Sequence, residues 1–412
     1  MKTRTLNTTL RAALKASLGV ATGAALSGHA LAADEVKLGV LLSFTGPIES
    51  LTPAMAGGAE MAIAEVNEAG TFLDGATVLP VRADATCIDS GAATTAAERL
   101  ITGDGIKALM GPDCSGVTGA VLANVALPNG IVMISPSATS PALSTAEDNG
   151  LFFRTAPSDA RQGEVMAQVL EERGITSAAL TYTNNDYGKG LADSIEQAFT
   201  ALGGELTISA AHEDGKADYS SEVAALASAG GDVLIVAGYL DQGGKGIMQA
   251  SLDTGAFDLF ALPDGMIGSS LTDALGGDGA LDGSFGTVAG TDSPGAKTMI
   301  EMAETAGISD GGELGPYVGE SYDAAALILL AMQAAGSAES ADFGERIVAL
   351  ANAPGEQIFP GELAKALEIV AEGGDIDYQG ATAVELSDGG ETFGAYREIE
   401  IVDGEITTAS FR

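Results

Sequence analysis

The sequence predicts an α/β fold with parallel central sheets, arranged in two successive halves. Short apolar runs alternate along the chain with helical segments, which is the pattern of βαβ units. Runs such as VKLGVLLSF at residues 36–44 are almost continuously apolar, as expected of strands buried on both faces. The alternation begins again after LFFRTAPSD at residues 151–159. A chain of 412 residues also exceeds one ordinary hydrophobic core, so we expect two domains.

The N-terminal residues have the features of a secretory signal. Basic residues occur at Lys2, Arg4, Arg11 and Lys15. The weakly polar ASLGVATGAAL then leads to HALAAD, where Ala30, Leu31 and Ala32 form the small-x-small pattern of a signal-peptidase site. We expect residues 1–32 to be removed, with cleavage near Ala32/Ala33; an amphipathic or disordered N-terminus is the alternative. No later apolar run approaches the roughly 20 residues of a spanning helix, so we expect a soluble, exported protein that is not inserted in a membrane.

The net charge excludes two classes of partner. Without the four basic residues of the signal, 15 Lys and Arg remain against 57 Asp and Glu, a formal charge of −42 with His neutral. Nucleic acids and anionic membrane surfaces bind through Lys and Arg that neutralise phosphate. We therefore expect neither as a partner.

The first half contains four strands and three helices in alternation. The first helix has Pro53 in its first turn, where the missing N–H costs nothing, and Gly70 as its stop signal. The predicted order is strand 36–44, helix 53–70, strand 77–84, helix 89–102, strand 107–112, helix 115–127 and strand 131–136.

The second half repeats this alternation without repeating the sequence. The predicted order is helix 160–173, strand 177–182, helix 186–202, strand 205–212, helix 219–229, strand 232–239, a helix that ends at 254, and strand 259–262. From Gly286 onward short strands mix with helices at 321–336 and 361–374, and 393–406 contains a strand pair that turns at Asp403 and Gly404.

The stretch MGPDCSGVTGA, residues 110–120, carries one of only two cysteines, Cys87 and Cys114. In an exported chain an even pair of cysteines indicates a disulfide, and two free thiols are the alternative. Cys114 is therefore expected to be structural, and Ser115 after it stands at a helix start.

Polar residues follow the strand that ends in this stretch, and they also follow four other predicted strands. They are Ser115, Ser137 with Thr139, Tyr187, Tyr239 and Asp264. Each has a structural alternative: a helix cap for Ser115, a turn for Ser137, Thr139 and Asp264, and core aromatics for the two tyrosines. Ligands of open parallel sheets bind outside the carboxyl ends of the strands, where helix N-termini present free N–H groups. The coincidence of these residues at strand ends in both halves favours a ligand site.

Several motifs together resemble the periplasmic leucine/isoleucine/valine-binding protein family. They are GGAEMAIAEVNEAG, the Cys87/Cys114 pair, CSGVTGA, ISPSATSPAL, NNDYGKGLADS and VAGYLDQGG. The resemblance implies the type I periplasmic binding protein fold, in which two Rossmann-like lobes are joined by a three-strand hinge and close on a ligand. The implied division is 1–32 signal, 33–156 and 288–385 N-terminal lobe, and 157–287 and 386–412 C-terminal lobe.

The resemblance also implies the site residues. In that family the loop after the second disulfide cysteine and the SPxAT turn hold the ligand's α-carboxylate, which corresponds here to Ser115, Ser137, Ala138 and Thr139. The closing lobe contributes two tyrosines, here Tyr187 and Tyr239, and an acid for the α-ammonium, commonly Glu in PEG. This chain has Asp264 in PDG, one methylene shorter, and Leu51 or a neighbour where an aromatic is usual.

The expected function is therefore the capture of an α-amino acid, branched-chain, hydrophobic or small polar, for delivery to an inner-membrane ABC permease from the periplasm. We expect a monomer that is not an enzyme and has no cofactor and no metal. One alternative keeps the fold but binds an amide, a urea-like molecule or an aromatic carboxylate. Another is an exported hydrolase, which is disfavoured because His212, expected to be solvated at a strand end, is the single candidate base. Acidic glycine-rich turns such as GGDGALDGS at 276–284 leave Ca²⁺ binding open.

Overall fold

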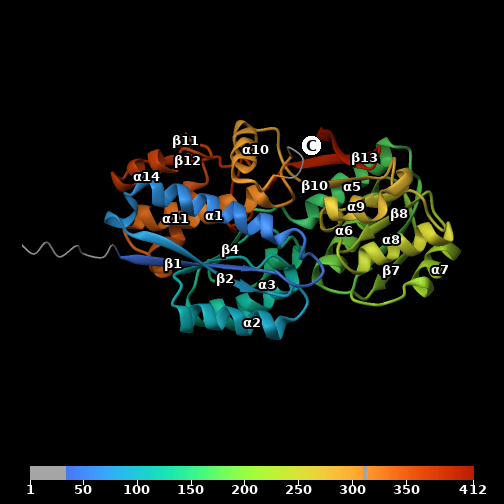
Figure 1. Ribbon diagram of the computed structural model, residues 1–412, viewed down its shortest axis with the longest axis horizontal. Helices are drawn as coiled ribbons and strands as arrows, with labels where there is room; N and C mark the ends of the chain where they lie inside the picture. The colour runs from blue at the N-terminus through green and yellow to red at the C-terminus, as the bar shows by residue number, and fades with distance from the viewer. Residues whose placement is uncertain (1–33, 310–312) are drawn as a thin grey trace, which may run out of the picture. The chain divides into compact units, whose positions relative to one another are not determined.

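The computed structural model describes residues 34–309 and 313–412 (Figure 1). The predicted signal segment and its cleavage point lie outside these residues. The described chain contains two larger β-sheets, called sheet A and sheet B below, and a small two-stranded sheet.

Sheet A has five strands in the order β2-β1-β3-β4-β5, all parallel. Its strands are β1 Glu35–Leu42, β2 Thr77–Asp84, β3 Ala108–Met110, β4 Met133–Ser135 and β5 Phe152–Arg154. The central strands β1, β3 and β4 are buried along nearly their whole length, as their continuous apolar sequences predict.

Helices cover both faces of sheet A. They are α1 Thr52–Ala69, α2 Ser90–Glu98, α3 Ser115–Val121 and, from later in the chain, α11 Val318–Ala335. Figure 1 shows α1 and α11 together on one face and α2 and α3 on the other. The crossover from β1 to β2 runs opposite to those that follow, and right-handed crossovers therefore place α1 on the face away from α2 and α3.

Sheet B has seven strands in the order β14-β13-β10-β9-β8-β6-β7. The strands β6 to β10 are parallel to one another, and β13 and β14 add an antiparallel hairpin next to β10. The bounds are β6 Ser177–Thr183, β7 Glu205–His212, β8 Val233–Ala237, β9 Phe260–Leu262, β10 Phe285–Ala289, β13 Tyr396–Val402 and β14 Glu405–Phe411. Helix α5 packs on α6 and α7 packs on α8, and the bounds are α5 Asp159–Glu172, α6 Asp186–Ala201, α7 Ser220–Ala229, α8 Gly243–Thr254 and α9 Ser269–Leu275.

The remaining elements lie between β10 and β13 in the chain. They are α10 Pro294–Ala306, α12 Ser340–Phe343, α13 Ile347–Leu350, α14 Leu363–Ala371 and the parallel pair β11 Glu356–Ile358 and β12 Ile376–Tyr378. The helical segment that starts with α3 continues through a π-helical turn, Leu122–Ala126, into α4 Leu127–Asn129. Shorter 3₁₀ or π turns are η1 Phe72–Asp74, η2 Arg99–Asp104, η4 Pro141–Thr145, η5 Asp264–Met266, η6 Gly277–Gly279 and η7 Gly344–Arg346.

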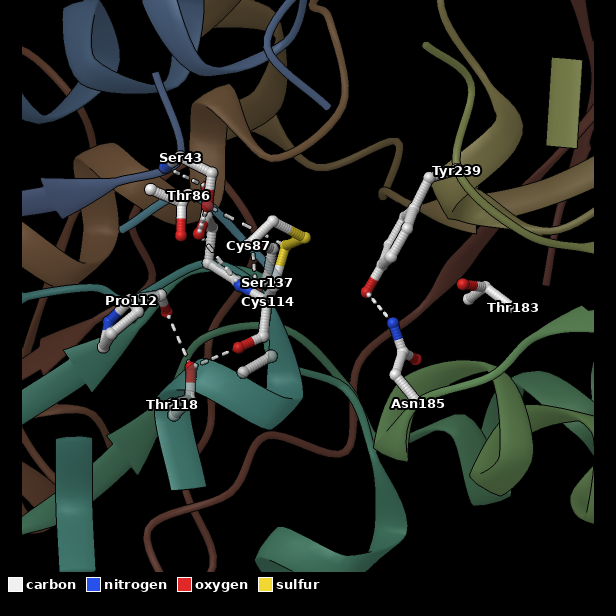
Figure 2. Close-up of a disulfide and its surroundings, with 12 residues drawn as sticks. Ser43, Thr86, Cys87, Pro112, Cys114, Thr118, Ser137, Thr183, Asn185 and Tyr239 are labelled. Atoms are coloured by element: carbon white, nitrogen blue, oxygen red, sulfur yellow. Dashed lines mark hydrogen bonds between the residues drawn. A yellow bond between two sulfur atoms is a disulfide. The ribbon is translucent and has the colours of Figure 1, made fainter. Parts of the chain in front are cut away.

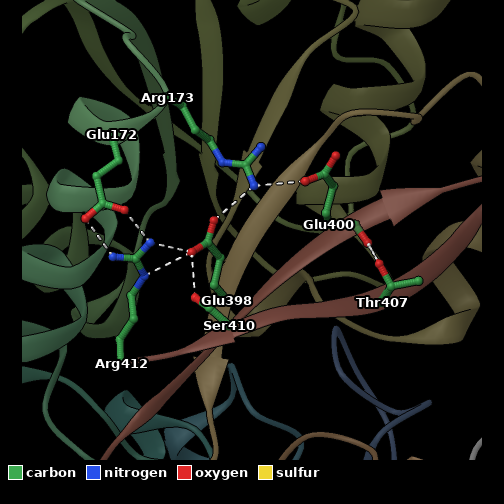
Figure 3. A network of polar contacts seen from close by, with 7 residues as sticks. All are labelled: Glu172, Arg173, Glu398, Glu400, Thr407, Ser410 and Arg412. Atoms are coloured by element: carbon green, nitrogen blue, oxygen red, sulfur yellow. Dashed lines mark hydrogen bonds and ion pairs between the residues drawn. The ribbon is translucent and has the colours of Figure 1, made fainter.

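Ion pairs fasten the C-terminal hairpin to the end of α5 (Figure 3). The Arg412 guanidinium contacts both Glu172 at 2.6 Å and Glu398, and Arg173 contacts Glu398 at 2.9 Å and Glu400 at 3.1 Å. Glu398 is mostly buried beneath both arginines, and these pairs lower the pKa of its carboxyl against the effect of burial. The hairpin is therefore held to sheet B by charge as well as by backbone pairing.

The predicted parallel sheets are confirmed, and most predicted elements agree with the structure to within a few residues. Gly70 ends α1 in the left-handed conformation, with a φ of 65°, as its position predicts. Within residues 34–309 and 313–412 no single helix is long and apolar enough to cross a membrane, although α11 and the bent segment 340–350 pass that test as a pair by length and composition.

Candidate functional site

The strand order reverses between β1 and β3 in sheet A and between β6 and β8 in sheet B. Such switch points leave a crevice outside the carboxyl ends of the strands, because the flanking connections diverge to opposite faces. The loops that leave β1, β3, β4, β6, β8 and β9 carry the predicted site residues. They surround one cavity of about 350 Å³, its mouth included. Its lining comprises Ile48, Leu51, Met55, Asp113, Cys114, Ser115, Ser137, Tyr187, Tyr239, Asp264, Gly265 and Tyr317.

Six of the eight predicted binding residues are therefore brought together: Leu51, Ser115, Ser137, Tyr187, Tyr239 and Asp264. The other two, Ala138 and Thr139, are buried and do not line the cavity. Ala138 donates its N–H to Ser135 Oγ at 3.0 Å, so this group already has an acceptor. The Thr139 hydroxyl has no hydrogen-bond partner among the described residues.

Asp264 is a buried carboxylate on the sheet B side of the cavity. The loop that leaves β9 makes a 3₁₀ turn at Asp264, and the Gly265 N–H points back to Asp264 Oδ1 at 2.7 Å. The Tyr187 hydroxyl donates to the same oxygen at 2.6 Å, and the Tyr317 hydroxyl donates to Oδ2. Burial raises the pKa of Asp264, while these donors oppose the rise because they stabilise the ionised form.

Two tyrosines make the aromatic wall next to Asp264. The rings of Tyr187 and Tyr239 stack with centroids 5.1 Å apart and planes inclined by 16°. Asn185 donates from Nδ2 to the Tyr239 hydroxyl at 3.4 Å, and its Oδ1 caps α6 by accepting the Gly188 N–H at 3.0 Å (Figure 2). One residue thus fixes both the start of α6, which carries Tyr187, and the orientation of Tyr239.

The sheet A side presents hydroxyls and a helix start. Ser115 is the first residue of α3, where the backbone N–H groups of a helix lack acceptors within the helix. Its Oγ accepts the Ser140 N–H at 3.1 Å, and Ser137 Oγ donates to the Asp113 carbonyl at 3.0 Å. This side therefore carries N–H and O–H groups together with the positive end of the helix dipole, which suits an anion.

The predicted disulfide between Cys87 and Cys114 is present (Figure 2), and Cys114 directly precedes Ser115 in the chain. The neighbouring Asp113 carboxylate binds the Ser43 N–H at 2.7 Å, the Ser43 hydroxyl at 2.6 Å and the Cys114 N–H at 2.9 Å. Burial raises the pKa of Asp113 in spite of these donors. The disulfide joins the loop after β2 to the loop after β3, and Asp113 joins that second loop to the end of β1 through Ser43, so together they hold the Ser115 loop in place.

The structure adds two residues that the sequence reasoning missed: Tyr317, which lines the cavity, and Asp159, which is buried near Asp264 without lining it. Tyr317 follows no strand and has a positive φ of 64°, so the strand-end pattern did not include it. Asp159 begins α5, is fully buried, and both of its carboxylate oxygens lack a hydrogen-bond partner among the described residues. Burial and the charge of Asp264 raise the pKa of the Asp159 carboxyl. The nearby Thr139 hydroxyl and the charge of Arg154 oppose this rise, although the Thr139 hydroxyl is not placed to form a hydrogen bond with the carboxylate.

The expectation that His212 is solvated is wrong. It is buried at the end of β7, with Nδ1 2.8 Å from the Thr181 hydroxyl and its ring edge-on to Tyr219. Gly238 and Gly243 lack side chains there, which lets the imidazole pack beneath the start of α8. Burial lowers the pKa of His212 to about 4, so the ring is neutral at pH 7.

Metal-binding side chains do not gather in the part of the chain that the structure describes: no group of three or more His, Cys, Asp or Glu is placed to hold an ion there. In the glycine-rich turn at 276–284, Asp282 Oδ1 accepts the Gly404 N–H at 3.0 Å and so fastens the turn to the β13–β14 hairpin.

Curated relatives share much of this sequence. Leu/Ile/Val-binding protein homolog 3 of Brucella melitensis is 30% identical over 332 residues, which are 79% of this chain and 86% of the relative. The leucine-, isoleucine-, valine-, threonine-, and alanine-binding protein of Pseudomonas aeruginosa is 28% identical over 327 residues, 79% of this chain and 85% of the relative.

Solved structures confirm the predicted type I fold. The leucine-binding protein of Thermotoga maritima superposes with a TM-score of 0.74 at 21% identity, over 91% of this chain and 98% of that one. The branched-chain amino acid substrate-binding protein of Streptococcus pneumoniae, solved with isoleucine, gives 0.74 at 20% identity, over 92% and 99%. A solute-binding protein of R. palustris, solved with 4-hydroxybenzoate, gives 0.71 at 18% identity, over 92% and 97%.

The family described as periplasmic binding protein matches this chain over residues 35–360, a range that includes every strand of sheet A and every residue lining the cavity. Together with the relatives and the shared fold, this match shows that the chain belongs to the periplasmic binding protein family.

Proposed function

We propose that the protein captures an α-amino acid in the cavity between the two sheets and delivers it to an ABC permease, without catalysing a reaction. The observation that carries this proposal is the buried Asp264 carboxylate, which receives two tyrosine hydroxyls and one backbone N–H at the cavity wall. These donors are neutral, so the charge of an ionised Asp264 is not balanced by them. A ligand ammonium beside it supplies the missing positive charge and favours the ionised form.

The opposite side of the cavity supports the second half of the assignment. The Ser115 hydroxyl and the backbone N–H groups at the start of α3 offer donors, and an α-carboxylate accepts such donors without needing a full cation. Ser137 lines the same side, where its hydroxyl donates to the Asp113 carbonyl. Ile48, Leu51 and Met55 form an apolar wall from the loop after β1 and the first turns of α1. This wall favours an aliphatic side chain, in agreement with the leucine, isoleucine and valine named for the curated relatives.

Two ends of one ligand would then contact two different lobes. We assign residues 33–156 and 288–385 to the lobe of sheet A, and 157–287 and 386–412 to the lobe of sheet B. A ligand that bonds to both lobes stabilises their closed arrangement through its higher affinity for that state. We further propose that the protein is a monomer and that it is located in the periplasm after its signal is cleaved near Ala32/Ala33. Membership of the periplasmic binding protein family supports this location.

The test is a thermal-shift titration of ligand-stripped mature protein with leucine, 4-methylpentanoate and isopentylamine. The second lacks the ammonium and the third lacks the carboxylate, so each removes one half of the proposed recognition. Leucine at about 1,000 times its Kd should raise the free energy of unfolding by about 4 kcal/mol, and neither analogue should match it at the same concentration. Asp264→Asn should abolish the leucine shift, whereas Asp258→Asn, an exposed carboxylate outside the cavity, should preserve it.

The competing assignment is an aromatic carboxylate, as in the R. palustris structure. Benzoate and 4-hydroxybenzoate belong in the same titration. A shift with these acids that survives Asp264→Asn, without a leucine shift, would contradict the amino-acid assignment and keep the fold.

A further inference from the structure

A second cavity is also lined by Tyr317, and its lining does not include Asp264. It encloses about 910 Å³, its open mouth included, and lies among the end of β10, helix α10, residues 313–320 and the β13–β14 hairpin. Much of its wall is apolar, with Ala289, Ile300, Leu314, Pro316, Ala381 and Phe411. Tyr317 lines both cavities, so the two are separated by this one residue at that point.

Glu320 is the unusual group in this second cavity. It lies in the first turn of α11, is only 5% exposed, and lines the cavity. Its backbone carbonyl accepts the Thr155 hydroxyl at 2.8 Å, but its carboxyl receives no hydrogen bond from any other residue in 34–309 and 313–412. A buried carboxyl in that situation takes up either a proton or a cation.

The nearest positive charge does not fill this role. Arg397 on β13 faces the same cavity, but its guanidinium is paired with Glu313 and also donates to the Thr408 hydroxyl at 3.3 Å. Its attraction favours the ionised form of Glu320 and is opposed by burial and by Asp323 one turn along α11. Among Glu313, Arg397 and Glu320, one negative charge is therefore left without a counter-charge when Glu320 is ionised.

We propose that this cavity is a second binding site, for a small aliphatic amine whose ammonium pairs with Glu320 and whose chain lies on the apolar wall. The chemistry follows from the wall itself, which combines one uncompensated carboxyl with alanine, isoleucine, leucine, proline and phenylalanine side chains. The strongly negative charge of the chain, −38 for the full sequence, also draws cations rather than anions to its surface. The site is distinct from the amino-acid site, since none of its charged groups lines the first cavity and the two share only Tyr317.

Isothermal titration of the mature protein with n-butylammonium tests the proposal, with n-butanol and butyrate as probes that keep the chain but lose the cation. We expect butylammonium to bind and the other two to bind at least about tenfold more weakly. Glu320→Gln, which keeps the shape of the side chain, should weaken butylammonium about tenfold to a hundredfold. Glu304→Gln, on an exposed turn of α10, should bind like the wild type.

The Asp264→Asn variant shows in which of the two cavities the amine binds. Butylammonium binding that disappears in Asp264→Asn but persists in Glu320→Gln places the amine in the amino-acid cavity and overturns the proposal. Equal binding of butanol and butylammonium overturns it as well. Loss in Glu320→Gln alone supports it, whether or not leucine binds to the first cavity.

The pH dependence supplies a readout that a merely structural role would not give. Burial raises the pKa of Glu320 to about 8, so the carboxyl is mostly protonated at pH 7. Pairing with an ammonium must then release that proton, and butylammonium should bind more tightly as the pH rises from 6 to 8. A pH-independent affinity in the wild type, or the same dependence in Glu320→Gln, contradicts the pairing.

Discussion

The carboxylate of Asp241 accepts a hydrogen bond from the backbone N–H of Ser50 at 2.9 Å, joining the loop after β8 of sheet B to the loop after β1 of sheet A. The Asp241 N–H in turn donates to the Pro47 carbonyl at 3.0 Å. Ser270 Oγ donates to the other carboxylate oxygen at 3.1 Å and lies 3.2 Å from Ser50 Oγ. The loop held in this way also carries Ile48 and Leu51, two residues of the apolar wall of the first cavity.

Replacing Asp241 by alanine should therefore weaken the binding of the amino acid. The substitution removes the acceptor for Ser50 and Ser270 and leaves the direct ligand contacts in place. The loss of a charge-assisted hydrogen bond at a partly exposed site should raise the Kd of the ligand about three- to thirtyfold. Because the contact joins loops of the two sheets beside the cavity, most of the change should be in the dissociation rate. Stopped-flow displacement of bound ligand measures it.

Asp253→Ala is the matched control for this variant. Asp253 is an exposed carboxylate near the end of α8 whose recorded partner is Gln249 on the same helix. It should bind ligand like the wild type. If Asp241→Ala also retained the wild-type dissociation rate, the contact with Ser50 would have no part in ligand retention.

Tyr317→Phe should weaken ligand binding and move its pH dependence upward. The change removes the hydroxyl that donates to Asp264 Oδ2 and keeps the ring. This donor lowers the pKa of Asp264 by stabilising the ionised form, so its loss raises that pKa further. As the pH falls, the variant should lose ligand affinity at a higher pH than the wild type. Kd values for leucine measured between pH 4.5 and 8 test this, and Tyr182→Phe on β6 is the control. If Tyr317→Phe and the wild type had identical pH profiles, Tyr317 would have no part in the site.

The contrast between Asp264 and Tyr317 explains how much of the site could be predicted from the sequence. Asp264 follows the strand β9, so the rule that parallel-sheet ligands bind at carboxyl ends identifies it. Tyr317 follows an irregular segment and enters the site through a backbone with positive φ, which no local pattern specifies. Asp159 resembles an ordinary acid in the first turn of a helix, and only the tertiary packing shows that it is buried beside Arg154 and Asp264.

The fold was predictable where elements are long enough to show a period. The strands β2 and β7, with eight residues each, agree with their predicted ranges at both ends. The strands β5, β11 and β12 have three residues each and fall outside the regular alternation of strand and helix that identifies the equally short β3, β4 and β9. The strand-end position of His212 predicts that it is solvated, but the glycines that make room for its burial, Gly238 and Gly243, lie about 30 residues further along the chain.

Removing the disulfide should destabilise the protein and loosen the Ser115 loop. Cys87 and Cys114 close a loop with a sequence separation of 27, and the chain-entropy estimate for such a loop is about 3 to 4 kcal/mol. A Cys87→Ser, Cys114→Ser variant should lose about this much free energy of unfolding in urea, and its affinity for leucine should fall because Cys114 precedes Ser115. The reduced wild type serves as the comparison, and an unchanged urea midpoint after verified reduction would contradict the expectation.

Glu320→Gln should stabilise the protein at alkaline pH and leave its stability unchanged in acid. The pKa of Glu320 is raised by burial from 4.5 to about 8 in the folded protein, whereas the unfolded chain keeps the ordinary value. Below pH 4.5 both states hold the proton and the group costs nothing. Between 4.5 and 8 the unfolded state loses its proton first, so the free energy of unfolding falls as the pH rises, by at most about 5 kcal/mol in total.

The glutamine side chain in the variant has no proton to lose, so this pH-dependent fall in the free energy of unfolding is absent. Urea unfolding of both proteins in amine-free buffer at pH 4, 7 and 9 should therefore give free energies of unfolding that nearly coincide at pH 4 and separate toward pH 9, with Glu304→Gln following the wild type throughout. An equal difference at all three pH values would mean that Glu320 is hydrated rather than buried.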